Sequence, residues 1–238
     1  MPLPLKTKLT VKYVQQPFWT QQLGVFSNQM IPTTLVEAFL KNIPKKLAMI
    51  RLNLNASNRS EILELPPKTN LIMDLNPSFH ELKTSFSSNT KRNCKKSNHE
   101  NLSIDFDSKN ISQYLDFFKS HIKNKIAEEY YSKLYKLISQ SLRKEKGFIA
   151  LVKSNNEIIA ASFILKSKNR LIYRTGTSNP KGKELKAMFF LVESLIKRYS
   201  NSKIILDFEG SEIDGVARFY RGFGAKNIPY SYYQKFNN

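Results

Sequence analysis

The sequence predicts an α/β protein with a mixed sheet, arranged as two similar domains in tandem. Three observations support this fold class. Short runs that are apolar, or that alternate apolar and polar residues, recur along the whole chain between segments whose apolar residues have helical spacing. A polar turn, Ser154–Glu157, joins two such runs as a hairpin. Near the C-terminus, a strand at 203–209 passes directly into a short aromatic helix. We expect a truncated first domain at 1–97 and a second domain at 98–238.

The first section alternates strands and helices, and its order weakly echoes that of the second. It looks like the later portion of the same unit without an opening hairpin, so either the domain is shortened or upstream strands precede Met1. Its elements are expected as strands at 8–14, 47–54 and 70–75, a helix capped by threonine at 33–40, and a helix or helix pair at 77–97.

The second section begins with a short strand at 102–106, where a domain boundary fits best. One or two amphipathic helices are expected next, followed by three antiparallel strands, a long helix and a strand–helix–strand unit. The expected elements are helices within 111–145, strands at 147–153, 158–166 and 170–176, a helix at 184–199, a strand at 204–206, a helix over 215–224 and a terminal strand.

Composition indicates a globular, basic protein. Of 238 residues, 41% are hydrophobic and 12% aromatic, which disfavours a disordered chain. The net charge of +19, from 38 Lys+Arg against 19 Asp+Glu, favours an anionic partner. A base-composition bias toward Lys and Asn is the alternative, although it would not remove acidic residues.

Cysteine and histidine placement argues against a disulfide or a metal site. Cys94 is the single cysteine, so a reducing compartment is expected. His80, His99 and His121 lack ligand spacing and are expected at the surface. No apolar run has membrane-spanning length and no signal-peptide pattern opens the chain, so we expect a cytoplasmic protein without a membrane span.

The candidate catalytic residues are Asp207, Glu209 and Tyr220. The two acids follow the strand Ile204–Leu206 at strand alternation and should point to the same side. A buried carboxylate can accept a proton and a tyrosine can donate one. The alternative roles are lysine-pairing or capping carboxylates and a core aromatic.

Two basic segments are candidate anion sites. The loop at 175–184 precedes a helix, whose N-terminus suits a pyrophosphate, and Gly182 would allow close backbone approach. On the helix before residue 98, cations at i, i+4 spacing would form a phosphate-binding face. A solvated basic surface is the alternative for both. The cations of that helix are Lys91, Arg92, Lys95 and Lys96.

The segment at 203–230 resembles the last third of a GNAT acyltransferase. Ala217, Tyr220, Phe223 and Gly224 occupy a near version of the A-x-x-x-Y-x-x-x-G-F pattern. The loop at 175–184 departs from the family's Q/R-x-x-G-x-G/A pattern. The segment NLIMDL followed by TKRNCKK is similar to the bacterial FemABX family, which has two GNAT-like domains and moves amino acids from aminoacyl-tRNA onto peptidoglycan precursors. No long helical-hairpin arm of that family is visible.

The resemblance implies an acyltransferase that uses acyl-CoA or aminoacyl-tRNA and an amine acceptor such as a cell-wall precursor. The donor would lie between the strands at 170–176 and 203–209, with exposed backbone N–H groups binding its carbonyl. Tyr220 matches the tyrosine that protonates the leaving group. A non-catalytic GNAT-like scaffold and a basic nucleic-acid-binding protein are the alternatives, and the oligomeric state is left open. The implied donor-binding residues are Tyr173, Arg174, Gly176, Thr177, Lys181, Gly182 and Lys183.

Overall fold

The chain forms two compact units in the computed structural model, which describes residues 1–63, 65–210 and 213–237. One unit comprises Met1–Asn70 with Asn227–Asn238, and the other comprises Leu71–Lys226. Each unit is described by itself below. These units do not follow the boundary expected between residues 97 and 98, because residues 71–97 pack with the second unit and the last residues pack with the first. The tandem repeat boundary itself stays a prediction.

The first unit is built on a five-stranded sheet with the order β1-β2-β3-β12-β4. Strand β2 runs parallel to β3, and the other neighbours are antiparallel. Helix α1 contributes Val36 and Leu40 to a core with Ile50 and Leu52 of β3. The elements are β1 (Leu5–Lys8), β2 (Val11–Gln15), α1 (Thr33–Lys41), β3 (Met49–Asn53), β4 (Pro67–Lys68) and β12 (Tyr230–Phe236).

Two local expectations for this unit are wrong. The strand expected at 8–14 is a hairpin, turned at Leu9 and Thr10, both with positive φ. Such turns normally carry Asn or Gly, so neither residue signals one. The N-cap of α1 is Pro32, without a side-chain hydrogen bond, and Thr33 is already the first helical residue.

The second unit contains a seven-stranded sheet with the order β11-β5-β10-β9-β8-β7-β6. Strands β9 and β10 are parallel, whereas β10 and β5 are antiparallel, as are β9, β8, β7 and β6 in succession. The strands are β5 (Leu71–Asp74), β6 (Leu102–Ser108), β7 (Gly147–Ser154), β8 (Glu157–Lys166), β9 (Arg170–Ser178), β10 (Ile205–Asp207) and β11 (Lys226–Asn227).

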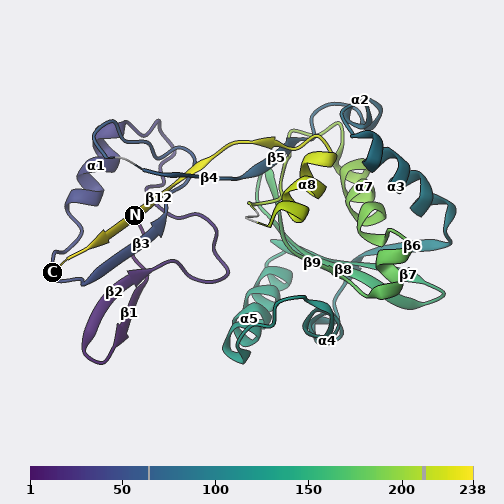
Figure 1. Ribbon diagram of the computed structural model, residues 1–238, viewed down its shortest axis with the longest axis horizontal. Helices are drawn as coiled ribbons and strands as arrows, with labels where there is room; N and C mark the ends of the chain where they lie inside the picture. Colours follow the sequence, from purple (N-terminus) through teal and green to yellow (C-terminus); the bar gives the residue numbers. More distant parts are fainter. Residues whose placement is uncertain (64, 211–212, 238) are drawn as a thin grey trace. The chain divides into compact units, whose positions relative to one another are not determined.

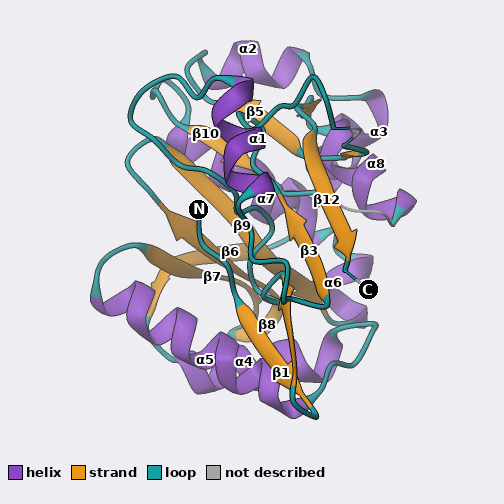
Figure 2. Cartoon of the chain, turned by 90° about the vertical axis from the view of Figure 1, so that its left-hand side faces the viewer, coloured by secondary structure: helices purple, strands orange, loops and turns teal. Residues whose placement is uncertain are grey.

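Helices cover both faces of this sheet (Figures 1 and 2). Helices α3, α7 and α8 lie on one face, where Leu191 and Ile196 pack with Leu171 and Leu206. Helices α4 and α5 lie on the other. Each fully buried side chain of this size contributes about 1.5–3 kcal/mol relative to exposure. The helices are α2 (Phe79–Thr84), α3 (Ser88–His99), α4 (Ile111–His121), α5 (Glu128–Arg143), α6 (Pro180–Glu184), α7 (Ala187–Tyr199) and α8 (Asp214–Gly222).

The order of elements expected for the second half is present. Asn155 and Asn156 have positive φ and close the β7–β8 hairpin, as that turn sequence predicts. The helix expected at 184–199 is divided: α6 ends at Glu184, and α7 begins after Lys186, which has a φ of 60°. None of the described helices is both long enough and apolar enough to cross a membrane.

Candidate active site

The central parallel strands of the second unit separate after a short paired stretch. The pairing of strand β10 with β9 begins at Ile205 and ends at Asp207, which lies opposite Ile172. Beyond that point the chain stays with β5, because the Phe208 N–H donates to the Leu71 carbonyl and the Leu71 N–H to the Glu209 carbonyl. The edge of β9 after Ile172 is therefore left without β10 as a neighbour. A strand edge of this kind offers backbone groups to a ligand.

A β-bulge lies in β9 where the strands separate. Tyr173 pairs with Ile164 and Thr175 with Phe163, so Arg174 is the additional residue. Buried hydroxyls support the bulge from the α4 side. The Thr175 hydroxyl accepts from the Phe163 N–H at 3.3 Å and lies 2.5 Å from the Tyr114 hydroxyl of α4. The shape of this edge is thus determined by specific side chains.

A cavity of about 510 Å³ lies at the open edge, and we call it the main cavity. Strand β9 contributes Tyr173, Gly176 and Thr177 to its wall. Helix α8 contributes Val216, Phe219 and Tyr220. Its volume is within the range of roughly 300–1,000 Å³ typical of small-molecule sites. The cavity brings together six of the ten residues expected in the catalytic and donor-binding groups, and one of the six is Gly182. The other five are Tyr173, Gly176, Thr177, Lys183 and Tyr220.

Two tyrosines, Tyr173 and Tyr220, belong to this wall. The Tyr220 ring stacks on Phe208 with centroids 4.6 Å apart and meets Tyr173 edge-on at 5.9 Å. Burial raises the pKa of both hydroxyls, so both stay protonated and can donate. The hydroxyl of Ser162, close to Tyr173, already donates to the Thr175 carbonyl at 2.6 Å. The Ser162 oxygen is close enough to lower the pKa of Tyr173, but the buried Tyr173 hydroxyl makes no hydrogen bond of good geometry among the described residues.

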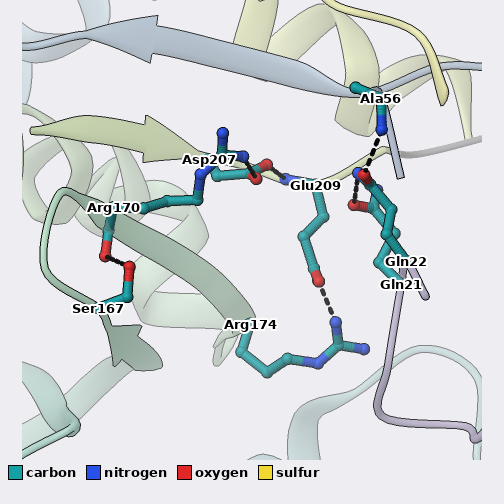
Figure 3. Close-up of polar contacts among 8 residues, drawn as sticks. All are labelled: Gln21, Gln22, Ala56, Ser167, Arg170, Arg174, Asp207 and Glu209. Atoms are coloured by element: carbon teal, nitrogen blue, oxygen red, sulfur yellow. Dashed lines mark hydrogen bonds and ion pairs between the residues drawn. The ribbon is translucent and has the colours of Figure 1, made fainter. Parts of the chain in front are cut away.

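The acid pair forms ion pairs with arginines of β9 (Figure 3). The Arg170 guanidinium donates to Asp207 at 2.5 Å, and Arg174 donates to Glu209. Asp207 also accepts the Glu209 N–H at 2.8 Å. Burial raises the pKa of Glu209 above its ordinary value, and the adjacent Arg174 opposes this shift. Neither carboxylate lines the main cavity, so their catalytic role stays a prediction.

The basic loop leads into helix α6, whose N-cap residue already accepts a hydrogen bond from the first turn of the helix. Asn179 accepts the Gly182 N–H at 2.7 Å. A Cβ on Gly182 would lie 2.1 Å from the Ile159 carbonyl oxygen, so glycine is needed here for packing against β8. The N-terminus of α7 has no side-chain cap and borders the main cavity, where Lys183 and Lys186 are also located. The helix end that can attract an anion is therefore that of α7.

The other cations expected at the site lie outside the main cavity. Lys181 pairs with Glu157 at 3.0 Å, and Arg174 with Glu209. The four cations expected on the helix before residue 98 are exposed on α3, and their role as phosphate contacts stays a prediction. They are Lys91, Arg92, Lys95 and Lys96.

His121 is a candidate functional residue that the sequence did not indicate. It is the last residue of α4, is half-buried, and is one of the residues that line the main cavity. Its Nδ1 lies 2.8 Å from the Phe117 carbonyl oxygen, which can only accept, so Nδ1 carries the proton. In the neutral ring Nε2 is then free to accept a proton. Nothing in the chain sequence near residue 121 indicates that α4 ends beside the open edge of β9.

The mixed sheet, with two parallel strands that separate beside a cavity, agrees with the fold class expected from the sequence. No sequence-family profile matches the chain. A comparison with curated proteins finds no significant match either.

Solved structures show the particular variant of the fold. The chain is similar to FemX with a TM-score of 0.64 and 11% identity, over 93% of this chain and 83% of FemX. A conserved protein of unknown function from Bacteroides thetaiotaomicron matches with a TM-score of 0.56 and 10% identity, over 86% and 67%. A tandem GNAT protein from the clavulanic acid biosynthesis pathway matches with a TM-score of 0.51 and 7% identity, over 87% and 67%. The chain thus has a FemABX/GNAT-like fold with tandem GNAT-like domains.

Among the described residues, no group of three or more His, Cys, Asp or Glu side chains could hold a metal ion. The polar groups of the main cavity are hydroxyls, amines and an imidazole. These can exchange protons and bind anions.

Proposed function

We propose that the chain is an N-acyltransferase that moves an acyl or aminoacyl group from acyl-CoA or aminoacyl-tRNA to an amine. The observation that carries this proposal is the main cavity beside the edge of β9 that no longer pairs with β10. The FemABX/GNAT-like fold and the cationic residues of the wall support it.

The reaction joins the amine nitrogen to the acyl carbonyl carbon and breaks the bond from that carbon to the sulfur or oxygen of the carrier. Backbone N–H groups at the edge of β9 would stabilise the negative charge that develops on the carbonyl oxygen. His121 Nε2 would accept the proton released by the amine. The protonated Tyr220 hydroxyl would give a proton to the departing sulfur or oxygen.

Other predicted residues have supporting roles in this proposal. Tyr173 would donate a hydrogen bond to the donor, and Lys183 and Lys186 would attract its anionic groups. Asp207 and Glu209 would hold Arg170 and Arg174, and with them the bulged edge of β9. A buried, paired carboxylate fits a positioning role better than that of a free base.

Transfer assays and binding measurements test the function. The purified chain is titrated with acetyl-CoA, a long-chain acyl-CoA and aminoacyl-tRNA, with free CoA and uncharged tRNA as controls. Thermal unfolding reports binding, and mass spectrometry detects the acylated amine of a cell-wall-type peptide or a small amine. We expect one donor class to stabilise the fold and to support transfer. Absence of binding and transfer with every donor would contradict the proposal.

A nucleic-acid-binding protein without catalysis is the second candidate. The exposed cations of α3 favour it, because a row of such charges binds phosphates by releasing counterions. This alternative predicts RNA binding that falls steeply with salt and is the same for charged and uncharged tRNA, together with no acyl transfer.

A further inference from the structure

A second cavity, of about 550 Å³, adjoins the main cavity, and we call it the side cavity. The two share Phe189, Gly215 and Phe219 as lining residues, so they meet along one boundary. The remaining wall of the side cavity comes from Arg218 of α8 and from residues around the start of α3, among them Asn89.

The boundary between the cavities is aromatic and open. The rings of Phe189 and Phe219 contact edge to face at 4.9 Å. A Cβ placed on Gly215 would have no atom within 4 Å, so space is free above its backbone. A ligand can therefore extend past Gly215 and lie against the ring of Phe219. Aromatic side chains in such positions stack on nucleobases without sequence preference.

The side cavity is cationic. Arg218 is exposed and has no carboxylate partner in the part of the chain that the structure describes. The Arg92 guanidinium donates to the Asn89 side chain at 2.9 Å, which places a second cation beside this wall. No Asp or Glu lines either cavity within the described residues, and the neighbouring Asp214 is exposed outside them.

From these observations we infer that the side cavity binds the phosphate-bearing nucleotide portion of the donor, while the acyl end of the same donor occupies the main cavity. This inference rests on the proposed acyl transfer. Arg218 contacts a phosphate, Phe219 lies against a base or the adjoining linker, and Gly215 leaves room for the connecting chain. The bound anionic carrier then extends from the main cavity toward α3, and not only along the lysines of the α6–α7 junction.

Variants at Arg218 and Gly215 test the inference. Arg218→Gln is compared with Arg221→Gln, which removes an exposed arginine from the same helix but outside both cavities. Gly215→Trp fills the boundary, whereas Gly215→Ala adds only a methyl group. Binding of acetyl-CoA and of a short RNA hairpin aminoacylated at its 3′ end is measured at several salt concentrations. The phosphate-free counterparts are acetyl-pantetheine and an aminoacyl-adenosine.

We expect Arg218→Gln to lower the affinity for the phosphate-bearing probe about tenfold, because one charged hydrogen bond is lost. The slope of log affinity against log salt concentration should fall by about one. Gly215→Trp should also abolish binding of that probe. Arg221→Gln should bind this probe as the unaltered chain does, and Gly215→Ala should weaken its binding far less than Gly215→Trp. Arg218→Gln should bind the phosphate-free donors with unchanged affinity. The responsive probe identifies CoA or RNA as the source of the phosphate.

Two results would overturn the inference: wild-type affinity of both Arg218→Gln and Gly215→Trp for the phosphate-bearing probes, or no binding of either probe by the unaltered chain. The proposed acyl transfer is read separately, from turnover of the phosphate-free donors by the unaltered chain. If the unaltered chain transfers the acyl group from those donors while Arg218→Gln and Gly215→Trp keep full affinity for the phosphate-bearing probes, the proposed function is retained and the side-cavity site is rejected.

Discussion

The two groups of polar side chains near the β9–β10 junction differ in how they are satisfied. Asp207 is buried, Glu209 is partly buried, and each holds an arginine, so their hydrogen-bonding capacity is used within the fold. Tyr173 is equally buried but has no well-formed partner in the described chain, and His121 has a free Nε2 beside the main cavity. A buried polar group normally has a partner. The unsatisfied group therefore indicates a ligand site better than the paired acids do.

His121→Asn gives the largest expected effect. Asparagine can still donate to the Phe117 carbonyl but lacks the second ring nitrogen, so proton acceptance is lost. Turnover should fall roughly 100- to 10,000-fold with donor affinity nearly unchanged. Steady-state kinetics and donor titration measure this. His99→Asn, at the exposed end of α3, is the control. Unchanged turnover in His121→Asn would remove the imidazole from the mechanism.

Tyr220→Phe should lower turnover about 100-fold while preserving the stack on Phe208, because only the proton-donating hydroxyl is removed. Single-turnover rates with a saturating donor measure the chemical step. The exposed Tyr135, changed to Phe, is the matched control. Equal rates in Tyr220→Phe and the unaltered chain would leave Tyr220 as a core aromatic.

Tyr173→Phe should separate binding from stability. Removing an unsatisfied buried hydroxyl should raise the free energy of unfolding by about 1 kcal/mol, because its desolvation is not compensated in the free protein. Donor affinity should fall at the same time. Urea unfolding and donor titration measure the two effects. A loss of stability would show that the hydroxyl has a structural partner after all.

Asp207→Asn should act mainly on stability. The substitution removes the charge that holds Arg170 and should lower the free energy of unfolding by about 1–3 kcal/mol. The lower end is expected, since the Arg170 side chain is 36% exposed and water can compensate. Turnover per folded molecule should change little. Normal stability with strongly reduced turnover would instead support the catalytic role expected from the sequence.

Glu209 gives the smallest effect, on the pH dependence of stability. Its pKa is raised above 4.5 by burial, so the folded chain keeps this proton to a higher pH than the unfolded chain. Its contribution favours folding below the ordinary glutamate pKa and is lost as pH rises through the folded value. Glu209→Gln should flatten that part of the stability curve. An identical pH profile in the variant would show that another group titrates there.

Much of the fold follows from residue patterns. The β7–β8 hairpin has two asparagines that tolerate positive φ, and α5 has a regular apolar face, so both could be predicted. The points at which an expected helix or strand is interrupted could not be predicted. Lys186 adopts a left-handed conformation without a glycine, and Leu9 and Thr10 form a turn without turn residues. Leu9 and Thr10 are exposed, and the pairing of β1 with β2 sets their turn. Lys186 lies between α6 and α7, where the chain must change direction between two helices.

The site was predictable only where its residues are close in sequence. Tyr173, Gly176 and Thr177 share one strand, and Tyr220 lies on the helix that follows β10, so the resemblance to GNAT enzymes could point to them; their roles stay predictions. His121 reaches the same cavity from α4, over a sequence separation that no local pattern spans. The ion pairs of Asp207 and Glu209 with Arg170 and Arg174 likewise depend on the register of β10 against β9.

The position of β12 has a consequence for synthesis on the ribosome. This strand lies between β3 and β4 of the first unit, although it is made about 160 residues after β4, once the whole second unit has been translated. The second unit can fold as it emerges, whereas the sheet of the first remains incomplete until its C-terminal strand leaves the exit tunnel. During that interval β3 has an open edge, which is where a chaperone or a neighbouring nascent chain would pair.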